Sequence, residues 1–284
     1  MFEDLCRALE TSGFSVHAIE ILTQGEVALH KCFDADRAYP VYSAAKSVTS
    51  MAFSLCCDDG ILSPESRLGD FIESKYKSSF PQGFDKLPFE RFLTMTAGSY
   101  PFRPEGDDWM KYILSLDVDF SDTAFHYSNI PAYLVGAACE NAVGQDLMSY
   151  LEKRIFQPMD MAAPKYTRCP QGHFYGATGM EMTVHQLAML GQLYLQKGKW
   201  NGQQLISQKA VSRAVSPHVF TGTDHYGYFF RAARDHFSIV GKWGQRCMVY
   251  PQKGIVAAYL SHCPNEAAQL YETVNSYITR ESIG

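Results

Sequence analysis

Strand-like segments lie at both ends of this 284-residue chain, and helical segments fill the middle. Near the N-terminus, residues 15–22 and 26–33 flank the turn Thr23-Gln24-Gly25, which is the pattern of a β-hairpin. Near the C-terminus, four segments rich in Tyr, Phe, Val and Ile are typical of successive antiparallel strands: residues 226–232, 237–240, 245–250 and 255–261. This order predicts one sheet built from both ends of the chain, with a helical part inserted into it.

The expected helices are marked by apolar residues at helical spacing, by capping residues and by glycines that follow them. They cover residues 2–9, 44–55, 89–96, 130–142, 146–155, 183–196 and 266–279, and Ser207 caps a further short helix. We therefore expect an α+β fold, in which an α/β sandwich with an antiparallel sheet carries an inserted all-helical domain. Residues 1–45 and 205–284 would form the sandwich and residues 46–204 the mainly helical insert, with the active site between the two.

Composition and charge argue against several classes of function. The formal net charge is -5, and no stripe of Lys and Arg is interleaved with aromatic residues, so no nucleic acid partner is expected. No segment approaches the roughly 18 continuous apolar residues of a membrane span, so no membrane partner is expected. The acidic start, Met1 to Asp4, lacks the pattern of a signal peptide, which predicts a cytoplasmic location. The eight cysteines show no CxxC spacing, and we expect reduced thiols rather than disulfides.

The first chemical motif, Ser43-Ala44-Ala45-Lys46, begins the first long apolar helix. A separation of three residues places the Ser43 hydroxyl and the Lys46 amine on one helix face, beside the free N–H groups of the helix start. A second S-x-x-K, from Ser74 to Lys77, lies in a charged, serine-rich stretch and is interpreted as a solvated loop. Taken alone, Ser43 would more often be a helix cap than a nucleophile.

Two further short motifs follow in chain order. Tyr127-Ser128-Asn129 comes just before the helix that begins near residue 130, and Lys242-Trp243-Gly244 lies between two strand-like segments. On their own, these motifs would be a capped turn and a hairpin corner or β-bulge. The glycine of the second motif would also let a substrate approach the backbone closely.

The order S-x-x-K, Y-x-N and K-x-G, each in suitable local structure, resembles the serine β-lactamase and penicillin-binding protein superfamily. Within it, the likeness is to class C β-lactamases, D-alanyl-D-alanine carboxypeptidases and related esterases. It covers almost the entire chain. Other segments that resemble the group are residues 92–98, 125–129, 155–161 and Gly244-Gln245 with the following Arg246 and Pro251.

The resemblance implies a serine hydrolase that forms an acyl-enzyme at Ser43, with Lys46 and Tyr127 sharing the role of base. The backbone N–H groups of Ser43 and Gln245 would form the oxyanion hole. The substrate-binding residues would be Asn129, Lys242, Trp243 and Gly244. Two nearby ammonium groups, of Lys46 and Lys242, are expected to lower the pKa of Tyr127, and burial is expected to lower the pKa of Lys46. Which of the two is the main base stays open.

Trp243 departs from the pattern of the group. Its β-lactamases and peptidases carry a small hydroxyl residue there, which helps to bind a substrate carboxylate, whereas an indole fills space and offers a single donor. Arg246 is an alternative carboxylate partner, if strand alternation points it toward the substrate. Trp243 therefore favours a carboxylesterase or amidase acting on a small-molecule ester or amide. A β-lactamase or D-Ala-D-Ala carboxypeptidase acting on β-lactams or peptides is the alternative.

Two other classes of protein compete with the hydrolase. A non-catalytic binding protein on the same fold is disfavoured because all the chemical residues are present. A metal hydrolase is disfavoured, and no metal site or other cofactor is expected, because no H-x-H or H-x-x-x-H spacing links His126, His173, His185, His225 and His236. The aromatic residues of the helical part either line an acyl pocket or pack in the core, and they include Tyr100, Phe102, Trp109 and Tyr112.

Overall fold

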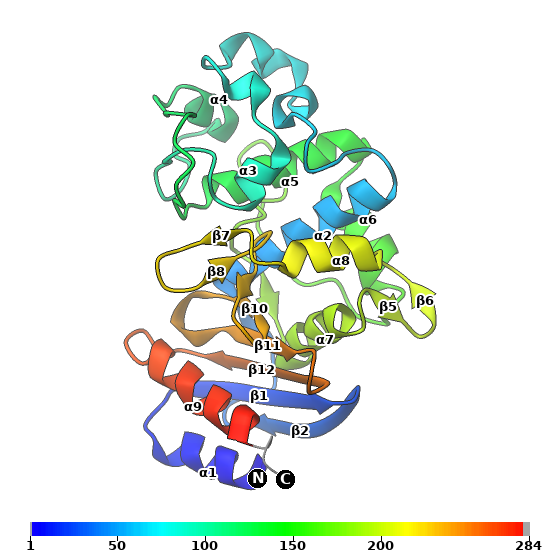
Figure 1. The fold of residues 1–284 in the computed structure, drawn as a ribbon, viewed down its shortest axis with the longest axis vertical. Helices are drawn as coiled ribbons and strands as arrows, with labels where there is room; N and C mark the ends of the chain where they lie inside the picture. The colour runs from blue at the N-terminus through cyan, green and yellow to red at the C-terminus, as the bar shows by residue number, and fades with distance from the viewer. Residues whose placement is uncertain (1, 281–284) are drawn as a thin grey trace.

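The computed structural model describes residues 2–280, within which eight strands form one antiparallel sheet (Figure 1). The strand order is β2-β1-β12-β11-β10-β9-β8-β7, so the N-terminal hairpin pairs with the last strand of the chain. The strands of this sheet are β1 (Val16–Thr23), β2 (Glu26–Cys32), β7 (Val219–Phe220), β8 (His225–Tyr226), β9 (Arg231–Ala232), β10 (Phe237–Val240), β11 (Arg246–Tyr250) and β12 (Ile255–Ser261). The expectation of a sheet built from both ends of the chain is confirmed.

The two faces of the sheet bury different sets of side chains, because successive residues of a strand point to opposite sides. Ile19 and Ile21 of β1 pack with one apolar cluster, to which α1 (Phe2–Thr11) and α9 (Ala267–Thr279) contribute leucines, valine and isoleucine. Ala18 and Leu22 belong to the main core on the opposite face, where α7 (Val184–Leu195) covers β1, β11 and β12. The sheet is thus sandwiched between helices (Figure 1).

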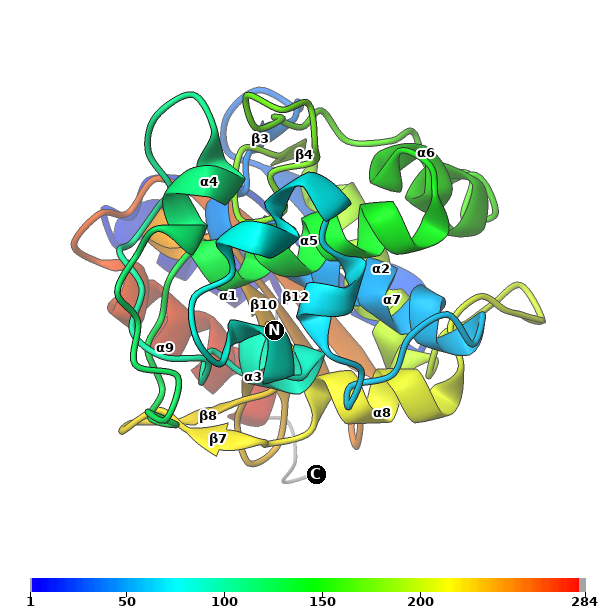
Figure 2. The same ribbon diagram turned by 90° about the horizontal axis from the view of Figure 1, so that it is seen from above.

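The remaining helices lie mostly beyond the α7 side of the sheet. They are α2 (Ala45–Asp58), α3 (Phe89–Leu93), α4 (Trp109–Leu114), α5 (Ile130–Val143), α6 (Leu147–Leu151) and α8 (Gln208–Val215). Helix α2 is buried along almost its whole length, because α5 and α8 pack against it (Figures 1 and 2). Two minor sheets pair β3 (Tyr39–Pro40) with β4 (Glu181–Met182) and β5 (Lys199–Trp200) with β6 (Gln203–Gln204).

The predicted α+β class is confirmed: both ends of the chain form the antiparallel sheet, and most of the helices lie between them in the sequence. Helix α7 falls within residues 46–204 of the expected insert, but it packs on the sheet. Its buried residues belong to the main core. All eight cysteines are free thiols. Within residues 2–280, no helix combines the length and apolar character needed to cross a membrane.

Two local expectations are wrong. Residues 226–232 do not form one strand: a turn separates β8 from β9, in which the Gly227 N–H donates to the carbonyl of Phe230 and Phe229 has a φ of 61°. A side chain at Gly227 would overlap the carbonyl of Ala214, so the turn brings the backbone close to α8. The stretch Ser74–Ser79 is a 3-10 helix rather than a solvated loop, because Tyr76 is buried in the main core.

Two helical glycines give a matched test of this packing. A Cβ at Gly191 of α7 would overlap the Cys247 sulfur and come within 2.9 Å of Val256 Cγ1, whereas one at Gly136 of α5 would meet no atom closer than 3.7 Å. We expect Gly191→Ala to lower the free energy of unfolding by about 1–3 kcal/mol through overpacking. Gly136→Ala is expected to be neutral or to stabilise by up to about 1 kcal/mol, through its higher helix propensity. Urea denaturation measures both, and equal effects would contradict the close contact of α7 with the sheet.

Candidate active site

Ser43 lies in a single 3-10 turn, Tyr42–Ala44, that leads directly into α2. Tyr42 has a φ of 49°, a left-handed conformation that is uncommon for a residue with a side chain. The turn is held by a hydrogen bond from the N–H of Ala44 to the carbonyl of Val41, whose own N–H donates to the carbonyl of Met180. The helix start therefore places the Ser43 hydroxyl in a cleft and not at a solvent-exposed cap.

Lys46 lies in the first turn of α2 and is only 1% exposed. Its Nζ is 3.1 Å from Ser43 Oγ, 2.6 Å from Asn129 Oδ1 and 2.9 Å from the carbonyl oxygen of Ala177. Burial lowers the pKa of Lys46 to about 7, because an apolar environment disfavours the charged amine. The expected direction of this shift is confirmed, and a large fraction of the amine is neutral at physiological pH.

Tyr127 lies beside Ser43 in the cleft, and its ring lies 4.9 Å from Lys46 Nζ. The expectation that two ammonium groups lower the pKa of Tyr127 is wrong. Burial raises the pKa of Tyr127, although the nearby Ser43 side chain and the charge of Arg231 act in the opposite direction. Tyr127 is therefore a neutral phenol at physiological pH.

Asn129 stands at the N-cap position of α5, but its side chain makes no capping bond. Its carbonyl oxygen accepts from Lys46, and its Nδ2 donates to the Tyr175 hydroxyl over 3.3 Å. The backbone N–H of Asn129 donates to the carbonyl of Phe102. Asn129 thus orients the amine beside the serine and ties α5 to one wall of the cleft.

The third motif forms a 3-10 turn, Lys242–Gly244, between β10 and β11. Lys242 is exposed and lines the cleft, while the backbone of Trp243 is left-handed, with a φ of 62°. The indole packs against Tyr42 and His262, with ring centroids 5.0 and 4.5 Å away, and is absent from the described lining of the cleft. The Trp243 indole therefore does not fill the space for the substrate, contrary to the expectation from the sequence.

Gln245 follows this turn and is 2% exposed. Its side-chain amide donates to the carbonyl of Ser261 and accepts from the N–H of the same residue, which pins the turn to β12. A Cβ at Gly244 would overlap Ser261 Oγ, so the close approach of turn and strand requires glycine there. These contacts fix the backbone at Gln245 against β12, whereas the described lining of the cleft includes Gly241 and Lys242 of the same turn.

The cleft has a volume of about 840 Å³. Three cationic side chains line it, those of Arg103, Arg231 and Lys242, against one carboxylate, Glu105. Its described lining comprises Tyr42, Ser43, Phe102, Arg103, Pro104, Glu105, Gly106, Trp109, Tyr127, Asn129, Tyr175, Thr178, Tyr226, Phe229, Arg231, Val240, Gly241 and Lys242. The cleft therefore suits a small molecule with some negative charge.

Not all of the candidate residues reach the cleft. Arg246 lies 4.1 Å from the Tyr271 ring and lines a different cavity, so it is not the carboxylate partner considered from the sequence. Among the aromatic candidates, Phe102 and Trp109 line the cleft, whereas Tyr100 is buried in the core.

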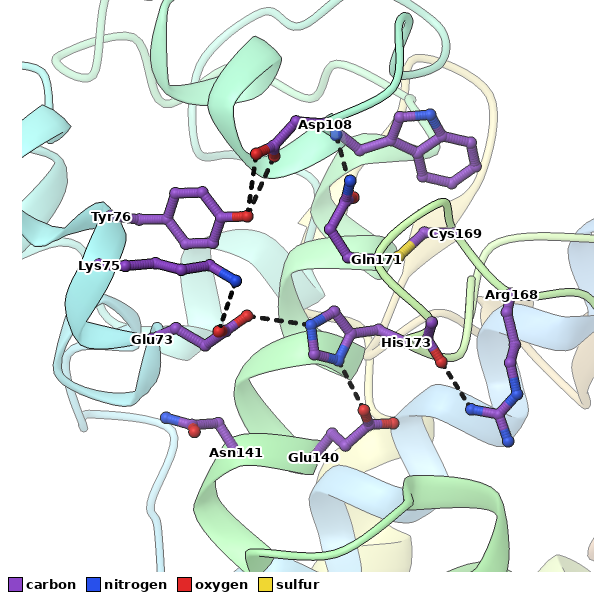
Figure 3. Close-up of polar contacts among 12 residues, drawn as sticks. Glu73, Lys75, Tyr76, Asp108, Glu140, Asn141, Arg168, Cys169, Gln171 and His173 are labelled. Carbon is purple, nitrogen blue, oxygen red and sulfur yellow. Dashed lines mark hydrogen bonds and ion pairs between the residues drawn. The ribbon is translucent and has the colours of Figure 1, made fainter.

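A polar network fixes the start of α4, which carries Trp109 of the cleft lining (Figure 3). The Tyr76 hydroxyl donates to Asp108, which caps α4, and Gln171 bonds both the carbonyl of Asp107 and the N–H of Trp109. Below these contacts, the His173 ring lies between two carboxylates, 2.6 Å from Glu140 and 3.1 Å from Glu73 (Figure 3). The hydrogen bond with Glu140 raises the pKa of His173, and both of its ring nitrogens have carboxylate partners.

Comparison with known families agrees with this geometry. The Beta-lactamase family model matches residues 15–274, which is most of the chain. The chain belongs to the Beta-lactamase family. The expected place in the serine β-lactamase and penicillin-binding protein superfamily is confirmed. No curated protein matches the chain by sequence.

Solved structures share the fold at low identity. A penicillin-binding protein from Bacillus halodurans is 16% identical, with a TM-score of 0.77 over 96% of this chain and 99% of that one. A β-lactamase/D-alanine carboxypeptidase from Pseudomonas syringae is 13% identical, with a TM-score of 0.77 over 97% of each chain. A penicillin-binding protein homologue from Caulobacter crescentus is 15% identical, with a TM-score of 0.77 over 97% and 96%. At these identities the likeness shows the fold alone.

Sequence reasoning missed several groups of the site. The carbonyl of Ala177, which accepts from Lys46, carries no side-chain signal at all. Arg103 and Tyr175 lie in loops without a motif. Arg231 lies in the segment 226–232, for which the sequence predicts a continuous strand. Only the folded chain brings these residues to the serine.

Proposed function

We propose that the chain is a serine hydrolase that cleaves small esters or amides through an acyl-enzyme at Ser43. The observation that supports this most strongly is the buried Lys46 amine, 3.1 Å from the Ser43 hydroxyl and with a pKa lowered to about 7. A serine hydroxyl needs a neutral base within hydrogen-bond reach to become a nucleophile. Lys46 meets both requirements at physiological pH.

The contacts of the amine favour Lys46 as the base over Tyr127. A neutral amine has two hydrogens and one lone pair. Asn129 Oδ1 and the carbonyl of Ala177 accept the two hydrogens, which directs the lone pair toward the third neighbour, Ser43 Oγ. Tyr127 has a raised pKa and a proton to give, so its hydroxyl suits the opposite task, donation to the leaving group.

In this mechanism, Ser43 Oγ attacks the substrate carbonyl while its proton passes to Lys46. The backbone N–H groups of Ser43 and Gln245 would stabilise the oxyanion, each contributing roughly 2.7–4 kcal/mol. The leaving group departs with a proton from Tyr127, which regains one from Lys46. Water then attacks the acyl-enzyme by the same route, releasing the acid and restoring Ser43.

The charges of the cleft favour a substrate that carries a carboxylate. Arg103 and Lys242 are exposed at the cleft, and Arg231, which also lines it, is paired with Asp224 at 2.7 Å. This observation also supports the second candidate function, reaction with β-lactams or D-Ala-D-Ala peptides, which carry a carboxylate. The missing hydroxyl at Trp243 favours esters and amides as the main substrates.

The nucleophile can be tested with a fluorophosphonate probe, which labels activated serines. We expect one label on the wild type at Ser43, no label on Ser43→Ala, and full labelling of Ser74→Ala, which alters the second S-x-x-K motif. Intact mass after incubation with p-nitrophenyl esters and penicillins should show the acyl adduct only when Ser43 is present. A folded wild type that takes up no label would overturn the proposal.

The acid limb of the pH profile, which is the fall of the acylation rate at low pH, tests whether Lys46 is the base. Because the neutral amine is the active form, the rate of Ser43 acylation should fall about tenfold per pH unit below pH 7. In Asn129→Asp a carboxylate would stabilise the ammonium and move this limb upward by about 1–3 pH units. Tyr175→Phe changes the same network without adding charge and should leave the limb near 7. A limb that Asn129→Asp does not move would exclude Lys46 as the base.

The preference for anionic substrates can be measured with p-nitrophenyl esters whose acyl chains are neutral or end in a carboxylate. Arg103→Gln should lower kcat/KM for the anionic ester by about two- to fivefold relative to the neutral one, as expected for an exposed charge pair. Arg234→Gln removes an exposed charge outside the cleft lining and serves as the control. An equal effect of both variants would show that only net charge matters.

A further inference from the structure

Three side chains with metal-binding atoms meet at the outer edge of the sheet, away from the cleft. They are His30 and Cys32 at the end of β2 and Asp36 in the segment that follows. One ligand atom from each lies within 4.8 Å of the other two, and His30 Nε2 is 3.6 Å from Cys32 Sγ. Residues two apart on a strand share a face, so this arrangement follows from the strand itself.

A buried carboxylate orients the histidine of this cluster. Glu20 of β1 is 1% exposed and lies directly opposite His30 in the antiparallel pair. Its Oε2 is 2.6 Å from His30 Nδ1, and its Oε1 is 2.8 Å from the Nδ1 of His185 on α7. Because a carboxylate only accepts hydrogen bonds, Nδ1 of His30 carries a proton, and in the neutral ring the lone pair is on Nε2, 3.6 Å from Cys32 Sγ.

The same arrangement of carboxylate, histidine and metal recurs in zinc proteins, where the carboxylate fixes the tautomer of the ligand. The separation of the first two ligand atoms also fits. Zinc bonds of about 2.0–2.3 Å in a tetrahedron place neighbouring ligand atoms about 3.3–3.8 Å apart, which includes the 3.6 Å between His30 and Cys32.

We propose that His30 Nε2, Cys32 Sγ and the carboxylate of Asp36 form a Zn²⁺ site with a fourth position open to water. A thiolate and a carboxylate balance the charge of the ion, and imidazole with thiolate is a donor set that suits zinc. The side chains of His30 and Asp36 are exposed, so an ion can enter from solvent without rearrangement of the core.

The site lies outside the hydrolytic cleft and does not depend on the proposed function. The ion would link the end of the edge strand β2 to the segment that leads to β3 and Ser43. Histidine spacing alone does not reveal it, because the ligands are one histidine, one thiol and one carboxylate.

Cobalt reports thiolate ligation directly, so the full chain in reduced form is titrated with Co²⁺. We expect one equivalent to bind, with a thiolate-to-cobalt charge-transfer band in the near ultraviolet that Zn²⁺ abolishes. Cys32→Ser and His30→Gln should each remove the band. Cys6→Ser, which alters another partly exposed thiol, should keep it. Glu20→Gln should weaken Zn²⁺ binding about 10–100-fold in competition with a chromophoric chelator.

Three results would overturn the proposal. They are a wild type that binds no Co²⁺, a band that persists in Cys32→Ser, or a band that Cys6→Ser removes. Circular dichroism of the metal-free variants separates loss of ligands from loss of fold, and His30→Gln provides a second ligand variant. Labelling of Ser43 should be unchanged in the Cys32→Ser variant, so failure of the zinc site and failure of the hydrolase proposal are distinguishable.

Discussion

A buried lysine amine links the parts of the molecule that form the site. Lys46 lies on α2, Asn129 begins α5, and Ala177 belongs to a loop far along the chain, yet all three converge within hydrogen-bond distance. Burying an amine without partners is unfavourable, so the fold places acceptors around it and leaves it largely neutral. The need to satisfy this one group therefore positions three separate segments around Ser43.

The sheet fixes the turn of the third motif, Lys242–Gly244, through contacts with β12. The turn after β10 holds Trp243 in a left-handed conformation, and side-chain contacts stabilise it: the Ser261 hydroxyl donates to the Trp243 carbonyl, and the Gln245 amide bonds the backbone of Ser261. Tyr42, next to Ser43, is also left-handed and packs on the same indole. Backbone strain at functional sites persists where the surroundings fix it, and here the two strained turns support each other through the contact of Tyr42 with Trp243.

What the sequence predicted well was local or periodic. β10 and β12 have the expected bounds, and the capping box at Thr183 begins α7 as its residues indicate. The three motifs converge because each is tied to the start of a helix or the end of a strand. The carbonyl of Ala177 and the charge of Arg231 were not predictable, since a backbone acceptor has no residue signature and the turn before Arg231 depends on close packing against α8.

The pKa of Tyr127 was predicted in the wrong direction for a reason that clarifies the chemistry. Charge attraction was expected to dominate, but burial acts on both titratable groups and moves their pKa values apart, lowering that of Lys46 and raising that of Tyr127. The result at neutral pH is an uncharged base and an uncharged acid on either side of one hydroxyl. In the proposed mechanism, this pair would start uncharged, take a proton from Ser43 at Lys46 and return one to the leaving group from Tyr127. On this proposal, desolvation would assign the two roles.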